Sequence, residues 1–379
     1  MSIDVSLIIL AAGSSSRFEK KAAKQWLRSG ELPLWLAVTQ KLKSEYPFAR
    51  CVVTGHPDDL GYMAQFISEA DGITLVAGGA ERQFSLKAAV APVTSEYVLV
   101  TDVARACVDA ELMRRLFDAV DGADCVVPFI GVSDTVVYGE EGIDRTRVKR
   151  IQTPQLSRTA FLKKSLETET LYTDESTMVK ACGGRVVYVE GQEHAAKITF
   201  AKDLAALPCI EPPVSDTFVG NGFDVHAFEA GRKMVLCGVS IDDVDYGFKA
   251  HSDGDVAIHA LIDAILGAAG AGDIGELFPD TDDSFKDIDS KILLEACVRR
   301  VNRYGFDIVN ADITIIAQAP RLGAYKPRMK AKIAEILGIA PFRVNIKATT
   351  TEKLGFVGRK EGVAVMATAS LKYFDWTLT

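Results

Sequence analysis

Short apolar stretches alternate with amphipathic ones along residues 1–205. Apolar or β-branched runs predict buried strands at 5–10, 51–54, 74–76, 97–101, 125–128 and 185–189. Between them, apolar residues recur at helical spacing and predict helices at 34–45, 58–69, 83–91, 110–120 and 158–166. Strands that alternate with helices favour a mostly parallel sheet with helices on both faces, so we expect an α/β domain.

A polar connector follows this pattern at residues 208–217. It contains Pro208, Pro212 and Pro213, which cannot donate backbone hydrogen bonds to a helix or sheet. The periodic pattern then restarts, with strands from 218 and at 308–317, 343–348 and 363–371, and helices after 253 and at 290–304 and 327–337. We therefore predict an α/β domain at 1–207, a linker at 208–217 and a smaller α+β domain at 218–379.

Composition narrows the function classes. The 379 residues carry a net charge of −8, which argues against binding to nucleic acid or to an anionic membrane. The apolar run at 7–12 is too short for a signal sequence or a membrane span. The seven cysteines are scattered without a Cys-x-x-Cys pair, so we expect buried, reduced thiols and a cytoplasmic protein.

A small-residue loop follows the first predicted strand. Residues 10–17 read Leu-Ala-Ala-Gly-Ser-Ser-Ser-Arg, and the backbone N–H groups of such a loop can surround a phosphate. Arg17 and Lys24 are placed to hold phosphoryl oxygens, while the P-loop and dinucleotide fingerprints are absent. Asp102 ends the strand at 97–101, where ligands of open α/β sheets bind, and a carboxylate there suits Mg²⁺. The alternative is an ordinary turn and a capping aspartate.

Three of the five histidines fall between residues 226 and 259. Asp224 and His226 are two apart, so in a strand they point the same way. Asp253 is a suitable N-cap for a helix that carries His259, with Asp263 one turn later as a candidate to orient an imidazole. One carboxylate and two imidazoles suit Zn²⁺ with an open fourth position. Unrelated surface histidines beside a capping aspartate are the alternative.

Several motifs of the first half occur in the order of a known family. They are Leu10-Ala-Ala-Gly with Arg17, Lys24-Gln-Trp-Leu, Gly78-Gly-Ala-Glu-Arg82-Gln-Phe-Ser85, Val100-Thr-Asp102-Val-Ala-Arg105, Asp134-Thr135, Thr153-Pro-Gln, Thr173-Asp-Glu and Lys197-Ile-Thr. Residues 1–205 thereby resemble 2-C-methyl-D-erythritol 4-phosphate cytidylyltransferase. The resemblance implies a Rossmann-like nucleotidyltransferase sheet and the conversion of CTP and methylerythritol 4-phosphate into 4-diphosphocytidyl-methylerythritol and pyrophosphate, with Mg²⁺.

The same resemblance implies roles for individual residues. Arg17 and Lys24 would stabilise the transition state at the α-phosphate, Arg145 and Lys197 would position methylerythritol phosphate, and Asp102 would hold the metal. Substrate contacts are implied for Ala11, Ala12, Gly13, Gly78, Gly79, Arg82, Ser85, Asp102, Arg105 and Thr135. Two positions depart from the family, because Ala80 stands where an aspartate is usual and Val103 replaces an alanine.

The second half carries a denser set of motifs. They are Gly222-Phe-Asp224-Val-His226, His251-Ser-Asp253-Gly-Asp-Val-Ala-Ile-His259, Gly272-Asp273-Ile-Gly275, Leu277-Phe278-Pro-Asp280, Ile316-Ala317-Gln-Ala-Pro320, Lys347-Ala-Thr349-Thr350-Thr351-Glu352-Lys-Leu-Gly-Phe356 and Gly358-Arg359. Residues 218–379 resemble 2-C-methyl-D-erythritol 2,4-cyclodiphosphate synthase. The resemblance implies that the 2-phosphate of the substrate attacks the β-phosphorus of its own cytidine diphosphate arm and releases CMP.

The implied ligands of Zn²⁺, or of another divalent ion, are Asp224, His226 and His259, and Glu352 would hold a second ion such as Mg²⁺. His251 and Thr350 are the implied transition-state stabilisers. Substrate contacts are implied for Asp224, His226, His251, Ser252, Asp273, Ile274, Gly275, Phe278, Asp280, Ala317, Arg321, Thr349, Thr350, Thr351, Glu352, Phe356 and Arg359. Arg321 replaces a frequent lysine, which keeps the charge but alters the geometry. The family is trimeric with sites at subunit boundaries, which implies a homo-oligomer.

Together these patterns predict a bifunctional enzyme of the methylerythritol phosphate pathway to isoprenoid precursors. Three alternatives stay open: one half is a binding or scaffolding module, the first half acts on a sugar phosphate or molybdopterin, or the zinc is structural. The matches at Asp134-Thr135 and Lys197 argue against the second, and the three visible ligands argue against the third because structural sites are usually closed by four. A kinase step separates the two reactions, and that kinase is a possible partner.

Overall fold

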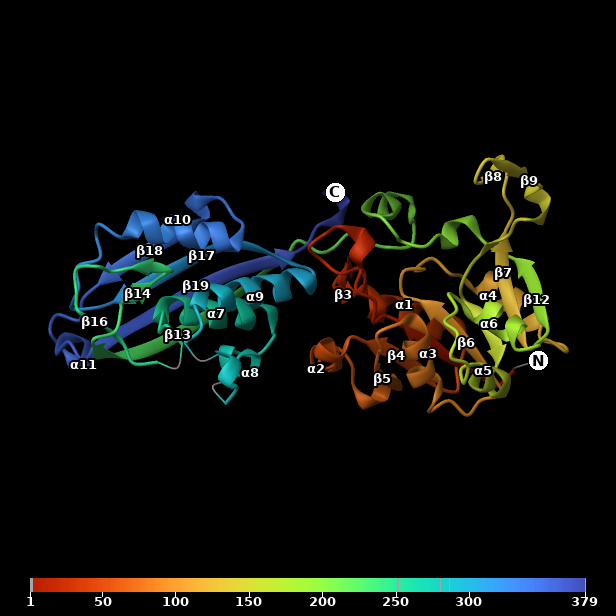
Figure 1. Cartoon of the computed structure of the whole chain (residues 1–379), viewed down its shortest axis with the longest axis horizontal. Helices are drawn as coiled ribbons and strands as arrows, with labels where there is room; N and C mark the ends of the chain where they lie inside the picture. The colour runs from red at the N-terminus through yellow and green to blue at the C-terminus, as the bar shows by residue number, and fades with distance from the viewer. Residues whose placement is uncertain (1–2, 251, 280, 286, 379) are drawn as a thin grey trace. The chain divides into compact units, whose positions relative to one another are not determined.

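The computed structural model describes residues 3–250, 252–279, 281–285 and 287–378. They form two compact units, Met1–Pro213 together with Asp375–Thr379, and Val214–Phe374. The predicted domain boundaries differ at the C-terminus, because the chain returns to the first unit after residue 374 (Figure 1). There Trp376 is buried, and its Nε1–H donates to the backbone oxygen of Arg28 at 2.7 Å.

The first unit is built on an eight-stranded, mostly parallel sheet, as predicted. Its order is β10-β7-β11-β6-β1-β4-β5, and β12 pairs with β7. These strands are β1 (Val5–Leu10), β4 (Cys51–Gly55), β5 (Ile73–Ala77), β6 (Tyr97–Asp102), β7 (Cys125–Ile130), β10 (Arg150–Ile151), β11 (Gln155–Arg158) and β12 (Val186–Glu190). The six predicted strands are present, and the four-residue β11, which was not predicted, runs antiparallel between β6 and β7.

Helices cover both faces of this sheet. Helices α3 (Arg82–Val90), α5 (Thr159–Ser165) and α6 (Glu175–Ala181) pack one core with the side chains of Ile8, Val52 and Val100. The other face carries α4 (Ala110–Asp118), and Tyr46 at the end of α1 (Leu34–Glu45) contacts Phe117 of α4 with 4.7 Å between ring centroids. The predicted helix at 58–69 is shorter, because α2 (Leu60–Ala64) ends before a half-exposed segment.

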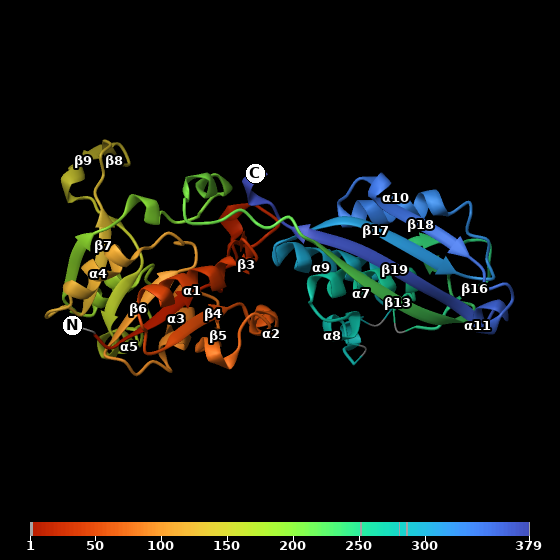
Figure 2. The same cartoon turned by 180° about the vertical axis from the view of Figure 1, so that it is seen from behind.

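Two small hairpins complete the first unit. Strands β2 (Arg28–Ser29) and β3 (Leu32–Pro33) pair beside α1, and β8 (Val136–Tyr138) pairs with β9 (Glu141–Ile143). The β8–β9 hairpin projects from the sheet (Figures 1 and 2) and exposes 60% of Val137 and 82% of Tyr138. It therefore offers an apolar surface at a distance from the sheet.

The second unit is an α+β layer pair, as predicted. Its five-stranded sheet has the order β16-β13-β19-β17-β18, and β17 and β18 are the parallel neighbours. The five strands are β13 (Thr217–Ala230), β16 (Tyr246–Phe248), β17 (Phe306–Ile316), β18 (Val344–Thr349) and β19 (Gly362–Tyr373), and a separate two-stranded sheet consists of β14 (Val235–Leu236) and β15 (Val239–Ser240). Its helices are α7 (Val256–Ala269), α8 (Ile274–Leu277), α9 (Ser290–Arg303), α10 (Lys326–Leu337) and α11 (Gly355–Gly358).

Helix α7 lies unusually close to the sheet because two glycines face it from β13. A Cβ added at Gly220 would lie 2.1 Å from the oxygen of Ala264, and one at Gly222 would lie 1.9 Å from the oxygen of Ala260. The helix begins later than predicted, since Asp255 and not Asp253 is its N-cap and accepts from the N–H of Ile258 at 3.1 Å. In the view of Figure 1, α7 and α9 lie along one face of the sheet, and Figure 2 shows the strands from behind.

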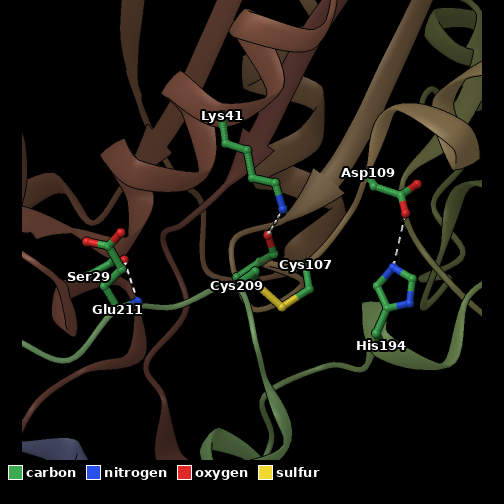
Figure 3. Close-up of a disulfide and its surroundings, with 8 residues drawn as sticks. Ser29, Lys41, Cys107, Asp109, His194, Cys209 and Glu211 are labelled. Atoms are coloured by element: carbon green, nitrogen blue, oxygen red, sulfur yellow. Dashed lines mark hydrogen bonds and ion pairs between the residues drawn. A yellow bond between two sulfur atoms is a disulfide. The ribbon is translucent and has the colours of Figure 1, made fainter.

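The cysteines depart from the prediction of buried, reduced thiols. Cys107 and Cys209 form a disulfide within the first unit (Figure 3), and Cys182 is exposed. Sequence spacing gave no signal for this pair, because 102 positions separate the two residues and folding brings them together. Within the described residues, no helix combines the length and the apolar character that crossing a membrane requires.

Candidate active sites

The first site is a cavity of about 650 Å³ at the carboxyl ends of β1, β4 and β6. It is bordered by the small-residue loop after β1, by residues 78–82 and by the end of β6. Of the predicted site residues, it brings together Ala12, Gly13, Arg17, Lys24, Gly78, Gly79, Arg82, Ser85, Asp102 and Lys197. Residues from five separate stretches of the chain therefore meet around one space.

Asp102 is the buried acid of this cavity. Its carboxylate accepts from Arg82 Nε at 3.0 Å and from Lys197 Nζ at 2.6 Å. Burial opposes the charge, but these two cations hold the pKa of Asp102 well below its usual range. The carboxylate is thus ionised and already neutralised by cations before any metal or substrate arrives.

Arg82 forms a second ion pair at this site, with the carboxylate of Glu175. The guanidinium donates from Nη1 to Glu175 Oε1 at 2.7 Å, and the Glu175 side chain is fully buried. Glu175 comes from the first turn of α6, within the Thr173-Asp-Glu motif, and its carboxylate keeps the guanidinium directed at Asp102.

Lys24 adds positive charge to the lining of the cavity. Its Nζ donates to the oxygen of Ile198 at 3.3 Å, and burial, helped by Lys197 and Arg17, lowers its pKa. Like charges gather in this way where an anion is to be bound, because the protein itself provides too few carboxylates to balance them.

The two glycines of the 78–85 segment are required by close approach. A Cβ at Gly78 would lie 2.2 Å from Cβ of Ala12, and one at Gly79 would lie 2.5 Å from Cβ of Phe84. Ser85 fixes this turn, since its Oγ accepts from the N–H of Gly79 at 3.0 Å. The backbone of the turn is therefore held at the cavity wall without a contribution from the side chain of Ala80.

Four predicted residues of this half do not line the cavity. Ala11 is buried and its N–H donates to Thr54 Oγ1, while Arg105 donates to the oxygens of Ala195 and Ile151. Thr135 and Arg145 flank the β8–β9 hairpin, are exposed, and lie outside the cavity; Arg145 donates to the oxygen of Ser133. Within this chain, Arg145 thus lies outside the cavity that Lys197 lines.

Sequence reasoning missed His56, Pro57 and Thr54, which line the cavity at the end of β4. A signal was available, because His56 follows the buried strand β4 directly and carboxyl ends of parallel strands meet at one edge. Gln25 also lines the cavity, and its Nε2 donates to the oxygen of Gly13 at 3.1 Å.

The second site is a cluster of three side chains in the other unit. Asp224 and His226 project from β13 toward α7, and His259 projects from α7 toward them. One oxygen, Oδ2 of Asp224, lies 3.2 Å from Nδ1 of His226 and 3.3 Å from Nδ1 of His259. Burial opposes the charge of Asp224, but the two imidazoles hold its pKa well below the usual range.

These distances fit a shared metal ion. Bonds of about 2.0–2.1 Å in a tetrahedral arrangement place two ligand atoms about 3.3 Å apart. The three potential ligand atoms lie within 4.8 Å of one another. Nδ1 of His226 is buried, and among the described residues none is in hydrogen-bonding geometry with it, as expected for a lone pair that points at an ion.

Asp263, predicted to orient an imidazole, makes a different contact. Its Oδ1 accepts from the N–H of Ile274 at 2.8 Å and so ties α7 to the start of α8. The other ring nitrogen of His259 faces two hydroxyls instead, Ser290 Oγ at 3.0 Å and Ser252 Oγ at 3.2 Å. Ser252, a predicted substrate contact, is therefore within reach of the cluster.

The remaining predicted residues of the second half lie in three groups. Asp273, Ile274, Gly275 and Phe278 lie in or beside α8, where Asp273 is the N-cap. Ala317 meets Thr349 where β17 and β18 end, since its N–H donates to the oxygen of Thr349 at 2.9 Å. The neighbouring loops carry Arg321, Thr350, Thr351 and Glu352, and Phe356 and Arg359 belong to or follow α11.

In the loop after β18, Thr350 Oγ1 donates to a carboxylate oxygen of Glu352 at 2.9 Å. The backbone of Glu352 has a φ of +50°. Glu352 is exposed, and it is not part of a carboxylate or imidazole cluster among the described residues. Arg359 pairs with Glu361 at 2.8 Å. The predicted residues His251 and Asp280 lie outside the described residues.

Comparisons with known proteins agree with this division of the chain. The family model of 2-C-methyl-D-erythritol 4-phosphate cytidylyltransferase matches residues 5–210, and that of the YgbB family matches residues 217–372. A bifunctional enzyme IspD/IspF of Campylobacter curvus is 54% identical over 375 residues, which cover 99% of this chain and 100% of that protein.

Two further relatives give the same result. A bifunctional enzyme IspD/IspF of a Sulfurovum species is 55% identical over 373 residues, or 98% of this chain and 99% of that protein. The solved structure of the bifunctional IspDF from Campylobacter jejuni matches with a TM-score of 0.92 and 49% identity, over 99% of this chain and 100% of that one.

Proposed function

The chain belongs to the family of bifunctional IspD/IspF enzymes, and from this premise we propose how its two units divide the chemistry between them. It is a bifunctional enzyme of the methylerythritol phosphate pathway, with a cytidylyltransferase unit and a cyclodiphosphate synthase unit. The alternative of an inactive first half is not favoured, since family models match both units.

In the first unit, CTP binds with its phosphates between the small-residue loop and Lys24. A phosphate oxygen of methylerythritol 4-phosphate attacks the α-phosphorus, and pyrophosphate leaves. Charge grows on the α-phosphate during this step, and Arg17, Lys24 and Lys197 line the space that it would occupy. That gathering of cations around a 650 Å³ cavity is the observation that carries the assignment, because phosphoryl-type transfer depends on positioning and charge neutralisation.

A Mg²⁺ ion would bind to Asp102 and to the triphosphate and neutralise phosphate charge. One carboxylate suits this use, because Mg²⁺ is often held by one or two carboxylates plus substrate phosphates. Arg82 and Lys197 both contact Asp102, so they keep this carboxylate ionised and able to bind a metal. Lys197 also lines the cavity, where it would contact the phosphate of methylerythritol phosphate.

In the second unit, Asp224, His226 and His259 would hold Zn²⁺ with one position open. The ion supplies Lewis acidity at the diphosphate of the substrate. The three side chains would thereby position that diphosphate, and Thr350 and Glu352, which are hydrogen-bonded to each other, would contact the substrate from the loop after β18. A second divalent ion at Glu352 would need substrate oxygens as further ligands, since Glu352 stands alone among the described carboxylates of its loop.

An oligomer, a trimer by resemblance, fits two observations in this unit. Strand β13 exposes 60% of Val219 and of Phe223 on the sheet face opposite α7, beside Met366 of β19, which is 53% exposed. In addition, three strand spacings, or roughly 14 Å, separate His226 on β13 from the loop after β18. A second copy packed against the apolar face can bring its own loop nearer to the metal cluster.

We propose that the enzyme acts in the cytoplasm. A kinase must act between the two reactions, because the first product lacks the 2-phosphate that the second reaction uses, and this kinase is a candidate partner. The test of the whole assignment is to supply each substrate to the purified full-length chain. Pyrophosphate from CTP and methylerythritol phosphate, and CMP from the phosphorylated cytidine substrate, are expected, and absence of either product removes the corresponding activity.

A further inference from the structure

His259 uses its two ring nitrogens in different ways. Nδ1 faces Asp224 Oδ2 at 3.3 Å, within the proposed metal cluster. Nε2 points the other way, to Ser290 Oγ at 3.0 Å. Ser290 is the first residue of α9 and is fully buried, although it lies 31 positions from His259 in the sequence. Packing of α9 against α7 therefore places one hydroxyl behind the imidazole.

The direction of this hydrogen bond follows from a third residue. Ser290 Oγ lies 2.6 Å from Asp253 Oδ1, and an ionised carboxylate can only accept, so the hydroxyl proton goes to Asp253. A serine has one hydroxyl proton, and toward His259 its oxygen must therefore accept. Nε2 of His259 then carries a proton, and Nδ1 is the ring nitrogen that faces the metal position beside Asp224 and His226.

Asp253 is well placed to hold this arrangement. Its Oδ2 also accepts from the N–H of Ser290 at 3.3 Å, and its Oδ1 accepts from the N–H of Asp255 at 3.2 Å. The carboxylate thus ties the loop before α7 to the first turn of α9. Both the position of the Ser290 hydroxyl and its hydrogen-bond direction are set by groups outside the metal cluster.

We propose that Ser290, held by Asp253, is a positioning residue that fixes the orientation and tautomer of His259 for metal binding. The inference rests on the proposed metal site and adds a residue that no motif of the sequence indicated. Metal-bound imidazoles generally donate their second N–H to a carboxylate, carbonyl or water, and here a serine relays that contact to a carboxylate. Asp263 does not take this part, because its Oδ1 is bonded to the N–H of Ile274.

Ser252 lies almost as close to Nε2, at 3.2 Å, but its situation differs. Its Oγ accepts from the N–H of Gly254 at 3.2 Å, and none of the hydrogen bonds described for it commits its proton to a carboxylate. A proton donated by Ser252 to Nε2 would favour the tautomer with hydrogen on Nδ1, which cannot bind a metal. Ser290 and Ser252 thus favour opposite tautomers of the His259 ring. We infer that Ser290 sets the tautomer, because its own proton is held by Asp253.

The test replaces Ser290 in the full-length chain by alanine and by threonine. The backbone contact of residue 290 with Asp253 and the N-cap Asp289 remain in both variants, and alanine is a good helix former. Zn²⁺ affinity is measured by competition with a chelator, and Co²⁺ is used as a spectroscopic probe. We expect Ser290→Ala to weaken metal binding by about 10–100-fold and Ser290→Thr, which keeps the hydroxyl, to stay within about threefold of wild type.

The tautomer is measured separately, from ring ¹⁵N shifts of His259 in the metal-free protein. Wild type and Ser290→Thr should carry a proton on Nε2, also where Asp224 holds one on Nδ1, and Ser290→Ala should shift the population toward rings protonated on Nδ1 alone. Ser240→Ala, at an exposed serine of the same unit, controls for the loss of a hydroxyl elsewhere and should change neither readout. If Ser290→Ala does not fold, Ser290→Cys carries the same expectation, because a thiol is only a weak acceptor.

Three outcomes would overturn the inference. Unchanged metal affinity in Ser290→Ala removes Ser290 from the positioning of His259. A normal tautomer with weakened binding limits Ser290 to packing. If wild type itself binds neither Zn²⁺ nor Co²⁺, the proposed metal site is wrong, and this failure is distinguishable because it does not depend on the variant.

Discussion

Gly222→Ala tests whether close packing of α7 on the sheet creates the metal cluster. The added Cβ would lie 1.9 Å from the oxygen of Ala260, whereas ordinary contacts of a Cβ begin near 3.4 Å. The difference of 1.5 Å must be met by movement of α7 away from β13. His259 precedes Ala260 in this helix, so its ring moves with the backbone that is displaced.

Such a movement is large against what a metal site tolerates. Ligand distances in metal sites hold to within about 0.2 Å, so a shift of 1.5 Å separates His259 from Asp224 and His226. Overpacking of this kind costs about 1–3 kcal/mol, and we expect the upper end because the clash is with backbone atoms. For a unit of this size, about 3 kcal/mol corresponds to a fall in melting temperature of roughly 6–12 °C.

The assays are calorimetry, chelator competition for Zn²⁺ and release of CMP by the full-length chain. Gly267→Ala is the matched control, because Gly267 lies in the same helix, is exposed and has nothing within 4 Å of an added Cβ. The control should be neutral or stabilising by up to about 1 kcal/mol, as alanine is the better helix former. Normal Zn²⁺ affinity and melting temperature in Gly222→Ala would refute the claim that this glycine sets the helix–sheet distance.

Three further predictions concern the first unit. The pKa of Lys24 is lowered by burial and by Lys197 and Arg17, so the cationic form is lost at a lower pH than the 10.5 of an ordinary lysine. The alkaline limb of kcat/KM for cytidylyl transfer should therefore lie below pH 10.5 and move upward in Lys24→Arg; an unmoved limb would exclude Lys24 as its source. Trp376→Ala should destabilise the first unit by about 3–5 kcal/mol, seen as a lower calorimetric transition for that unit while CMP release persists; a shift confined to the second unit would contradict the assignment of Trp376. The disulfide Cys107–Cys209 closes a loop of 102 positions, and its reduction should lower the stability of the first unit by up to about 4.7 kcal/mol. Thiol titration of the denatured, unreduced chain should find five free thiols among the seven cysteines. Seven free thiols would show that the disulfide is absent.

Sequence patterns predicted the features that depend on neighbouring residues. The two-residue spacing of Asp224 and His226 placed both on one face of β13, and helical spacing placed His259 on α7. Likewise, the position of Asp102 at the end of β6 followed from a continuous apolar run. These features are local, so periodicity is sufficient to predict them.

Features that depend on distant segments could not be predicted in this way. The four residues of β11 are too few to show a period, and their insertion between β6 and β7 depends on the finished sheet. The contact of Ser290 with His259 requires α9 to pack on α7, and the return of Trp376 to the first unit includes a hydrogen bond to Arg28, 348 positions earlier in the chain. The position of Arg145 outside the cavity that Lys197 lines is a further case, since it depends on where the β8–β9 hairpin lies.

The central claim is that one chain holds two separate active sites, and a reciprocal pair of variants tests it most directly. Lys24→Ala removes a cation from the first cavity, and His259→Ala removes a proposed metal ligand from the second cluster. Both activities are measured on each purified full-length variant, as pyrophosphate release and as CMP release. We expect Lys24→Ala to slow pyrophosphate release by roughly 10²–10³-fold with normal CMP release, and His259→Ala to abolish CMP release with normal pyrophosphate release. Loss of both activities in either variant, or of neither, would contradict two independent sites.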